Sequence, residues 1–201
     1  MRQTEDEITR DMLSSTATSY SCSNGVNGDS PTEITRTDVN AVVAMLLNNN
    51  AYTIMDNIEG ENKFGTAPVR DAYFGLGSTQ LIKDLDNVDG FINKNNYPSP
   101  MNALPSEWGA VGNVRFLLSS IGSVVLNSSD VNAADVYETF VCGREAYACV
   151  ELDGASASFI YTPPSIAGGP LQLNATAGYK FAEVPRILND DWIFRMRSTL
   201  A

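Results

Sequence analysis

Apolar residues recur at helical spacing in three segments of the chain, residues 4–17, 38–49 and 79–87. The repeating apolar positions are, in chain order, Ile8, Met12 and Leu13, then Val39, Val42, Val43, Leu46 and Leu47, then Leu81, Leu85 and Val88. Thr4 and Glu7 have the spacing of a capping box, and Thr35 or Thr37 is placed to cap the second segment. The sequence therefore predicts three helices, of which the second has the broadest buried face.

Alternation of side chains predicts a strand over residues 192–199, where Trp192, Phe194 and Met196 occupy every second position. Further strands are predicted over residues 114–119, 136–142, 146–152 and 157–162, with an interrupted strand region over 171–188 and an extended segment over 52–58. Residues rich in Gly, Pro, Ser and Asn predict a loop over 19–31, a helix or turn over 67–75, an irregular stretch over 95–105 and turns over 108–112, 143–145 and 189–191.

The first helix carries a thin apolar stripe and needs a surface on which to pack. The alternating face of Trp192, Phe194 and Met196, or a neighbour of that strand, would supply one. We therefore expect a mixed α/β body with two lobes, in which the two ends of the chain share a lobe.

Charge and residue usage narrow the classes of function. The net charge is −11, with 24 acidic against 13 basic residues and no basic patch, which argues against sequence-independent DNA binding. The absence of histidine excludes Ser-His-Asp and Cys-His catalysis and histidine-ligated zinc within this chain. Cys22, Cys142 and Cys149 are expected to be free thiols in a reducing cytoplasm. No run has the length of a transmembrane helix, and residues 1–7 do not resemble a signal peptide.

Two groups of acidic residues are candidates for a calcium site and a glycosidase site. Asp84, Asp86 and Asp89 precede Gly90 in a weak match to a calcium loop, but no Glu occupies the twelfth position, so a solvated helix face is favoured. Asp190 and Asp191 are adjacent carboxylates, but a hairpin turn is the natural setting of an Asn-Asp-Asp sequence, so a glycosidase site is disfavoured.

The remaining candidates lack the partners that their chemistry needs. Residues 75–78, with the sequence GLGS, are too short for a phosphate-binding loop and lack its lysine. Ser14, Ser15 and Ser78 have no histidine available as a base. The aromatic residues Tyr73, Phe74, Tyr97 and Trp108 are expected in the core or in subunit contacts rather than in a binding groove. No catalytic, cofactor-binding or metal-binding residue is predicted, and the chain is not expected to be an enzyme.

Four uninterrupted phrases carry a family resemblance. They are GTAPVRDAYF at 65–74, NYPSP at 96–100, EWG at 107–109 and AEVPRILND at 182–190. In this order they resemble the A and P domains of a tailed-bacteriophage major capsid protein of the Hong Kong 97 type. The resemblance implies an α+β fold, in which the end of the spine helix joins a mixed A-domain sheet with flanking helices and a P-domain β-hairpin. It assigns residues 1–23 and 179–201 to a P-domain-like lobe and 24–178 to an A-domain-like lobe.

The resemblance also implies what the protein does. Members of this family are structural subunits of icosahedral capsids, so we expect a bacteriophage or prophage major capsid protein, or a truncated piece of one. Such a subunit is made in the bacterial host cytoplasm, ends in the virion, self-associates into capsomers, contacts other virion proteins and encloses DNA without sequence-specific binding, with no cofactor and no membrane. The N-arm, the E-loop and the first part of the spine helix are absent, which predicts a monomer or small oligomer rather than a closed shell.

Two alternatives from other classes remain open at this stage. One is a carbohydrate-binding or glycoside-active domain, for which a concave site with paired carboxylates would be the sign. The other is a phage decoration protein or similar binding module.

Overall fold

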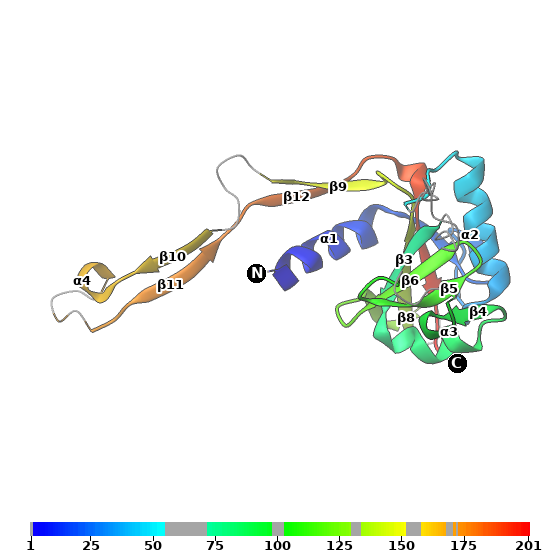
Figure 1. Ribbon diagram of the computed structural model, residues 1–201, viewed down its shortest axis with the longest axis horizontal. Coiled ribbons are helices and arrows are strands. Elements are labelled where there is room, and N and C mark those ends of the chain that lie inside the picture. Colours follow the sequence, from blue (N-terminus) through cyan, green and yellow to red (C-terminus); the bar gives the residue numbers. More distant parts are fainter. Residues whose placement is uncertain are drawn as a thin grey trace, which may run out of the picture.

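The computed structural model of the chain describes residues 2–54, 72–97, 103–129, 134–151, 158–167, 171 and 173–201 (Figure 1). Its helices are α1 (Arg2–Thr16), α2 (Arg36–Asn48), α3 (Ile82–Asn87) and α4 (Pro164–Ala167), with short 3₁₀ turns η1 (Thr79–Leu81), η2 (Lys94–Asn96) and η6 (Asp190–Trp192). Its strands are β1 (Thr18–Ser21), β2 (Gly25–Val26), β3 (Tyr73–Ser78), β4 (Phe91–Asn93), β5 (Glu107–Val111), β6 (Val114–Ser119), β7 (Val124–Ser128), β8 (Ala134–Cys142), β9 (Tyr147–Glu151), β10 (Ser158–Thr162), β11 (Thr176–Lys180), β12 (Glu183–Ile187) and β13 (Ile193–Ser198).

One mixed sheet of nine strands forms the body. Its order is β2-β1-β13-β8-β3-β6-β5-β4, and β7 pairs with β8 beside this path. β1 runs parallel to β13 and β3 runs parallel to β6, whereas the other pairs are antiparallel. The last strand of the sequence, β13, therefore lies between one of the first, β1, and the central β8.

The sheet buries a different core on each of its faces. On one face, Phe194, Met196 and Val141 pack with Val42 and Leu46 of α2 in the larger core. On the other face, Ile193, Phe140 and Cys142 pack with Leu13 and Ala17, which lie in and just after α1. The alternation of side chains along β8 and β13 thus separates α1 from α2.

Local patterns predicted the three long helical segments and most strands, and α2 is capped by Thr35, whose hydroxyl accepts the amide of Asp38 at 3.3 Å. Two details differ. Thr4 is not a cap, because α1 already begins at Arg2. α1 also does not rest on Phe194 and Met196, because the register of β13 turns these residues toward α2 and presents Ile193 to α1 instead.

Three predicted loops or turns contain strands, and in each case the cause is pairing with another strand. Residues 18–21 form β1 beside β13, so the loop predicted over 19–31 is wrong at its start. Residues 73–75 belong to β3, which is held between β6 and β8. Residues 107–111 form β5 against β4 and β6, so the predicted turn at 108–112 is confined to its end, where Gly112 has a positive φ of 55°.

Some predicted features lie outside the described residues. These are residues 55–58 of the extended segment, 65–71 and 98–100 of the phrases quoted above, 101–102 of the irregular stretch, and residues 152, 157 and 172 of the predicted strand regions. Within the part of the chain that is described, no helix has both the length and the apolar character needed to cross a membrane.

Candidate functional site: a projecting arm and the cleft at its root

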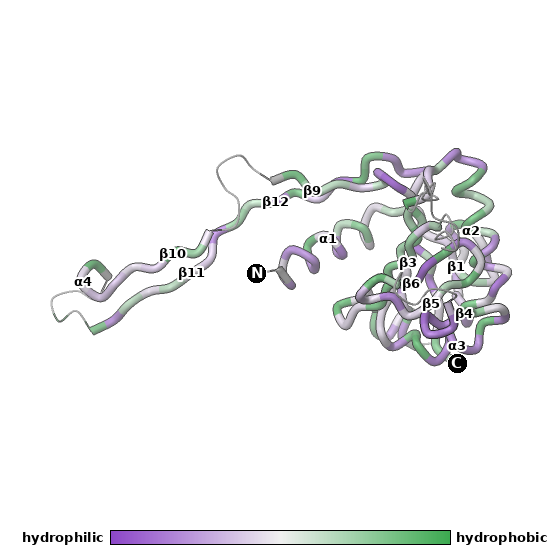
Figure 2. Tube along the Cα trace, in the orientation of Figure 1, coloured by the Kyte–Doolittle hydropathy of each residue, from purple (hydrophilic) through white to green (hydrophobic). Residues whose placement is uncertain are grey.

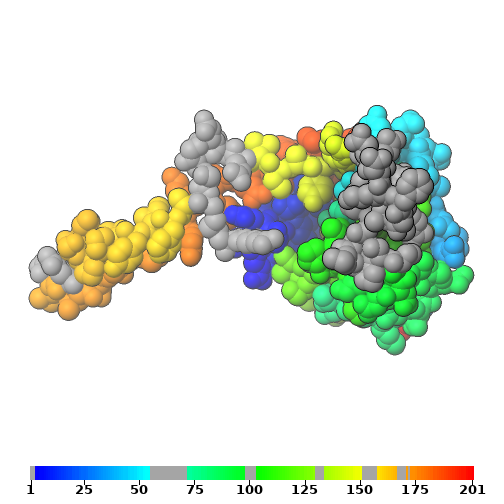
Figure 3. All heavy atoms as spheres, viewed as in Figure 1, coloured from blue at the N-terminus to red at the C-terminus, as the bar shows by residue number. Residues whose placement is uncertain are grey.

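A narrow arm projects from the body and gives the molecule its elongated shape (Figures 1 and 3). Its root is the antiparallel ribbon β9–β12 and its tip is the antiparallel ribbon β10–β11, which carries α4 at its far end (Figure 1). α1 lies beside the root and contacts β12. The arm is therefore one long hairpin that leaves the body after β8 and returns to it before β13.

The tip ribbon has one aromatic face. Phe159 lies directly opposite Tyr179, and their ring centroids are 5.2 Å apart. Tyr161 follows two residues after Phe159, so it belongs to the same face, whereas Ile160 and Gly178 pair on the opposite face. The tip thus presents three aromatic rings on one side and smaller side chains on the other.

These aromatic rings are open to solvent. Phe159, Tyr161 and Tyr179 are 60%, 57% and 67% exposed. Apolar exposure continues beyond them toward α4, at Ile166, Leu171 and Leu173, and Figure 2 shows hydrophobic colour along the arm as well as in the body. A concentration of exposed apolar side chains on one element marks an interaction surface.

The tip is also almost free of charge. Although the chain has a net charge of −11, Lys180 is the only charged residue in the sequence between 158 and 182. An interface core is typically poor in charged residues and rich in aromatic ones. The tip therefore has the composition of a binding surface, in contrast to the acidic chain that carries it.

The root of the arm packs against α1 through one face only. Tyr147 and Ile187 lie opposite each other and join the smaller core, and the hydroxyl of Thr9 and the Sγ of Cys149 are 3.5 Å apart. Val150 and Val184 pair on the outer face and are 61% and 57% exposed. α1 and the body thus fix the base of the arm and leave its outer face open.

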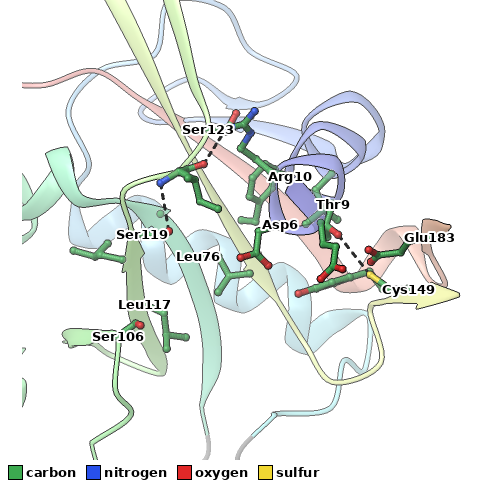
Figure 4. Close-up of a pocket in the computed structure, with 18 residues that line it drawn as sticks. Asp6, Thr9, Arg10, Leu76, Ser106, Leu117, Ser119, Ser123, Cys149 and Glu183 are labelled. Carbon is green, nitrogen blue, oxygen red and sulfur yellow. Dashed lines mark hydrogen bonds between the residues drawn. The ribbon is translucent and has the colours of Figure 1, made fainter. Parts of the chain in front are cut away.

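A cleft of about 490 Å³ opens between α1, the root of the arm and the sheet (Figure 4). Apolar side chains from the sheet and α1 line it, namely Leu13, Leu76, Leu117, Leu118, Ile121 and Phe140. Asp6 and Glu5 of α1 and Glu183 of β12 add carboxylates, and Cys149 lies on the same wall as Glu183 (Figure 4). This volume is in the range of about 300–1,000 Å³ typical of ligand sites.

A buried carboxylate holds α1 in position above the sheet. Glu138 of β8 is 1% exposed and accepts hydrogen bonds of 2.6 Å from the hydroxyls of Ser14 and Ser123. Arg195 of β13 lies 3.3 Å from the same carboxylate and also donates to the carbonyl oxygen of Ser14. Arg10 adds a 3.1 Å hydrogen bond to the carbonyl of Ile121. These contacts fix one wall of the cleft.

A second buried ion pair stabilises the far side of the sheet. Arg115 of β6 donates two hydrogen bonds to Glu107 of β5, from Nε at 2.7 Å and from Nη2 at 2.5 Å. The hydroxyl of Tyr97 and the amide of Leu104 donate to the same carboxylate at 2.6 and 2.9 Å. Burial acts to raise the pKa of Glu107, but these hydrogen bonds outweigh it and hold the pKa below its usual value.

The acidic residues considered as a calcium loop diverge in the structure. Asp84 is buried and lies 3.3 Å from the amide nitrogen of Ala201, Asp86 accepts the indole of Trp108 at 2.8 Å, and Asp89 lies 3.9 Å from Arg36. Among the described residues, no three His, Cys, Asp or Glu side chains form a group that would hold a metal ion.

The other sequence candidates also have structural positions. Asp190 and Asp191 are exposed in η6. The turn is not the predicted hairpin, because β12 pairs with β9 and β13 pairs with β8 and β1. Residues 75–78 lie in β3, where the backbone of Gly75 passes close to Phe116. A Cβ atom at this position would lie 3.0 Å from the Phe116 ring. Ser14 bonds Glu138, and Ser78 caps η1 by accepting the amide of Gln80 at 3.3 Å.

The three cysteines are free and differ in access. Cys22 and Cys142 are buried, and Cys149 is exposed. Burial raises the pKa of Cys142 to about 12 and raises that of Cys22 further. Tyr147, beside Cys149 on the arm, also has its pKa raised to about 12, mainly by burial. β8 and β9 follow each other closely but pair with different strands.

Residue patterns missed the arm as a unit. Strands were predicted over 146–152, 157–162 and 171–188, but their mutual pairing was not. The available signal is the run of 158–182, which combines Phe, Ile, Leu and Tyr with a single charge and has no helical period.

No protein-family model and no curated protein matches this sequence. The fold, in contrast, is similar to that of chains in solved structures of phage heads and capsids. A chain in the head structure of Helicobacter pylori bacteriophage KHP40 matches with a TM-score of 0.63 and 10% identity over 98% of this chain. A chain in the acidic stable capsid structure of Helicobacter pylori bacteriophage KHP30 matches with a TM-score of 0.55 and 10% identity, also over 98%. This chain spans 64% and 65% of those two chains. It therefore has a phage capsid-like, mixed α+β fold.

Proposed function

We propose that the protein is a structural subunit of a bacteriophage capsid and self-associates through its projecting arm. The observation that carries the proposal is the tip ribbon, whose aromatic face is 57–67% exposed although the chain has a substantial core elsewhere. Such a face is costly to leave in water and is stabilised when a partner covers it. The capsid-like fold of the two neighbours favours further copies of the same chain as that partner.

The role is that of shape and contact rather than of chemistry. A shell subunit meets several neighbours at once, so each contact can be weak while the assembly is stable. Under this proposal the protein resides in the virion, contacts other virion proteins and encloses DNA without reading its sequence, and it has no catalytic activity. An acidic chain with a net charge of −11 suits enclosure better than tight binding of DNA.

The division into Hong Kong 97-type domains is part of the same proposal. The P-domain-like lobe comprises residues 1–23 and 179–201, and the A-domain-like lobe comprises residues 24–178. Pairing of β1 with β13 supports the joining of the two ends. α1 also contacts β12 beside it (Figure 1), and both of these elements belong to the P-domain-like residues, whereas most of the arm belongs to the A-domain-like range.

Light scattering and sedimentation velocity test the proposal directly. The double variant Phe159→Ser/Tyr179→Ser removes two exposed rings of the arm, and Leu47→Ser/Leu126→Ser removes two residues that are 54% and 67% exposed on the body. We expect the unmodified chain to associate with rising concentration, the arm variant to stay monomeric and the body variant to behave like the unmodified chain. A chain that stays monomeric at all concentrations, or equal association of all three proteins, would contradict the proposal.

A further inference from the structure

We propose that the aromatic face of the tip ribbon from one copy docks into the cleft beside α1 of a second copy. This inference rests on the proposed self-association and names its two complementary surfaces. The inserted surface is the face of Phe159, Tyr161 and Tyr179. The receiving surface is the cleft floored by leucine and phenylalanine side chains next to Cys149.

The arm does not fill its own cleft. The tip ribbon lies beyond the N-terminal end of α1, whereas the cleft lies between α1 and the sheet (Figures 1 and 4). The root ribbon between them is held by five residue pairs from Tyr147–Ile187 to Glu151–Glu183 and by its contact with α1. A tip ribbon that occupies this cleft must therefore come from another copy of the protein.

The two surfaces match in apolar character. The cleft holds about 490 Å³ and is lined by Leu13, Leu76, Leu117, Leu118 and Phe140. A buried aromatic side chain removes about 150–250 Å² of surface from water, and it packs well against aliphatic walls. The tip offers three such rings on one side of a two-stranded ribbon.

Charge favours this pairing over contact between two acidic bodies. Each copy has a net charge of −11, so two bodies repel each other. The aromatic face of the tip brings no charged side chain to the contact, because Lys180 pairs with Ser158 on the opposite face, and the cleft already has Glu5, Asp6 and Glu183 around its apolar floor.

Symmetry also distinguishes this contact from contact between two arms. A contact of an arm with an arm is self-complementary and closes at a dimer. A contact of an arm with a cleft uses two different surfaces, so each copy retains one free arm or one free cleft, and the copies form a ring or an open chain. The arm-to-cleft contact is therefore the one that builds the many-membered assembly of the proposed function.

Cross-linking through the native Cys149 tests the contact. Cys149 is exposed on the cleft wall, and Phe159→Cys places a thiol on the aromatic face of the tip. Ile160→Cys is the matched control, because it is the next residue of the same strand, is 50% exposed and faces the other way. A short bifunctional maleimide joins thiols that are close, and peptide mass spectrometry identifies the linked residues.

We expect Phe159→Cys to give a ladder of linked species through 159–149 peptides, with a yield several-fold above that of Ile160→Cys. Adding Cys149→Ser should abolish these peptides. Equal yields from both positions, or linked species that join two arms and survive Cys149→Ser, would overturn the inference while leaving arm-mediated association intact. If scattering shows no association at all, the proposed function fails and this inference fails with it. Near-ultraviolet circular dichroism of each variant verifies that the body is folded.

Discussion

Ser14 of α1 donates a 2.6 Å hydrogen bond to the buried carboxylate of Glu138 in β8, 124 residues further along the chain. The carboxylate also accepts from Ser123 and faces Arg195, so one side chain holds together a helix, a loop and two strands. Because α1 forms a wall of the cleft, the geometry of the candidate site depends on this single acidic residue.

Replacing Glu138 with Ala should therefore destabilise the protein. The change leaves the hydroxyls of Ser14 and Ser123 without their acceptor and Arg195 without its counter-charge, and hydrogen bonds to a charged group are each worth about 1.5–3 kcal/mol. We expect a loss of at least that size in urea unfolding. Ser15→Ala is the control, because Ser15 is exposed and bonds only within α1, to the carbonyl of Met12 at 2.9 Å. Equal effects of the two changes would show that the network does not anchor the helix.

The Glu107–Arg115 pair predicts an acid dependence of stability. The pKa of Glu107 is held below its usual 4.5, so the unfolded chain binds this proton more readily than the folded one. The stabilisation is thus complete above the usual value and is lost as the pH falls through the lower, folded value. In Glu107→Gln, unfolding at neutral pH should be easier by about 3–5 kcal/mol, because the buried Arg115 loses the carboxylate that accepts two of its hydrogen bonds.

Urea titrations between neutral and strongly acidic pH measure this effect. The slope of stability against pH on the acid side should be shallower in Glu107→Gln than in the unmodified protein. Asp89→Asn provides the comparison, because its ion pair with Arg36 is largely exposed and contributes little. An unchanged acid slope in Glu107→Gln would contradict the assignment.

Replacement by alanine should destabilise the protein at one strand glycine and leave its stability almost unchanged at another. A Cβ at Gly109 of β5 would lie 2.4 Å from Phe91 and 2.5 Å from the carbonyl oxygen of Ile92, so β4 must move away. A Cβ at Gly178 of β11 meets nothing within 4 Å. We expect Gly109→Ala to cost at least about 1–3 kcal/mol, the usual range for overpacking, and Gly178→Ala to change stability by less than about 0.5 kcal/mol. Thermal unfolding of both variants compares them, and similar melting temperatures would exclude the close approach at Gly109.

Thiol labelling should separate the cysteines by position. In the folded protein only Cys149 is exposed, so one thiol should react well before the other two. Partial burial raises the pKa of Cys149 as well, so its labelling should accelerate as the pH rises. After denaturation all three cysteines of the sequence should react. Cys149→Ser should remove the fast phase alone. A count below three after denaturation would indicate a disulfide and contradict the expectation of free thiols.

Local patterns in the sequence predicted what depends on near neighbours along the chain. The apolar repeat of Val39, Val42 and Leu46 specifies α2, and the alternation from Trp192 to Arg197 specifies β13, because each pattern states which side of the element is buried. Residue patterns alone predicted a mixed α/β body, and the resemblance to capsid proteins added the capsid-like fold.

Pairing between distant segments was not predictable in the same way. Gly109 suggested a turn, but it lies in strand β5. A glycine is required at this position because Phe91 leaves no room for a side chain. Thr18 to Ser21 have the polar composition of a loop and become β1 because Phe194 to Arg197 lie beside them. The arm arises because residues 147–151 pair with residues 183–187, a choice of partner that alternation does not specify.

The place of β13 in the sheet sets an order of events during synthesis. Until the ribosome has made residues 193–198, β1 and β8 have no strand between them, and Arg195 is not yet available to neutralise Glu138. The seat of α1, and with it the cleft, is therefore complete only after the arm has been made. The sheet therefore cannot be completed from the N-terminus onward, because β1, made near the start of the chain, has to wait for β13 before it joins β8.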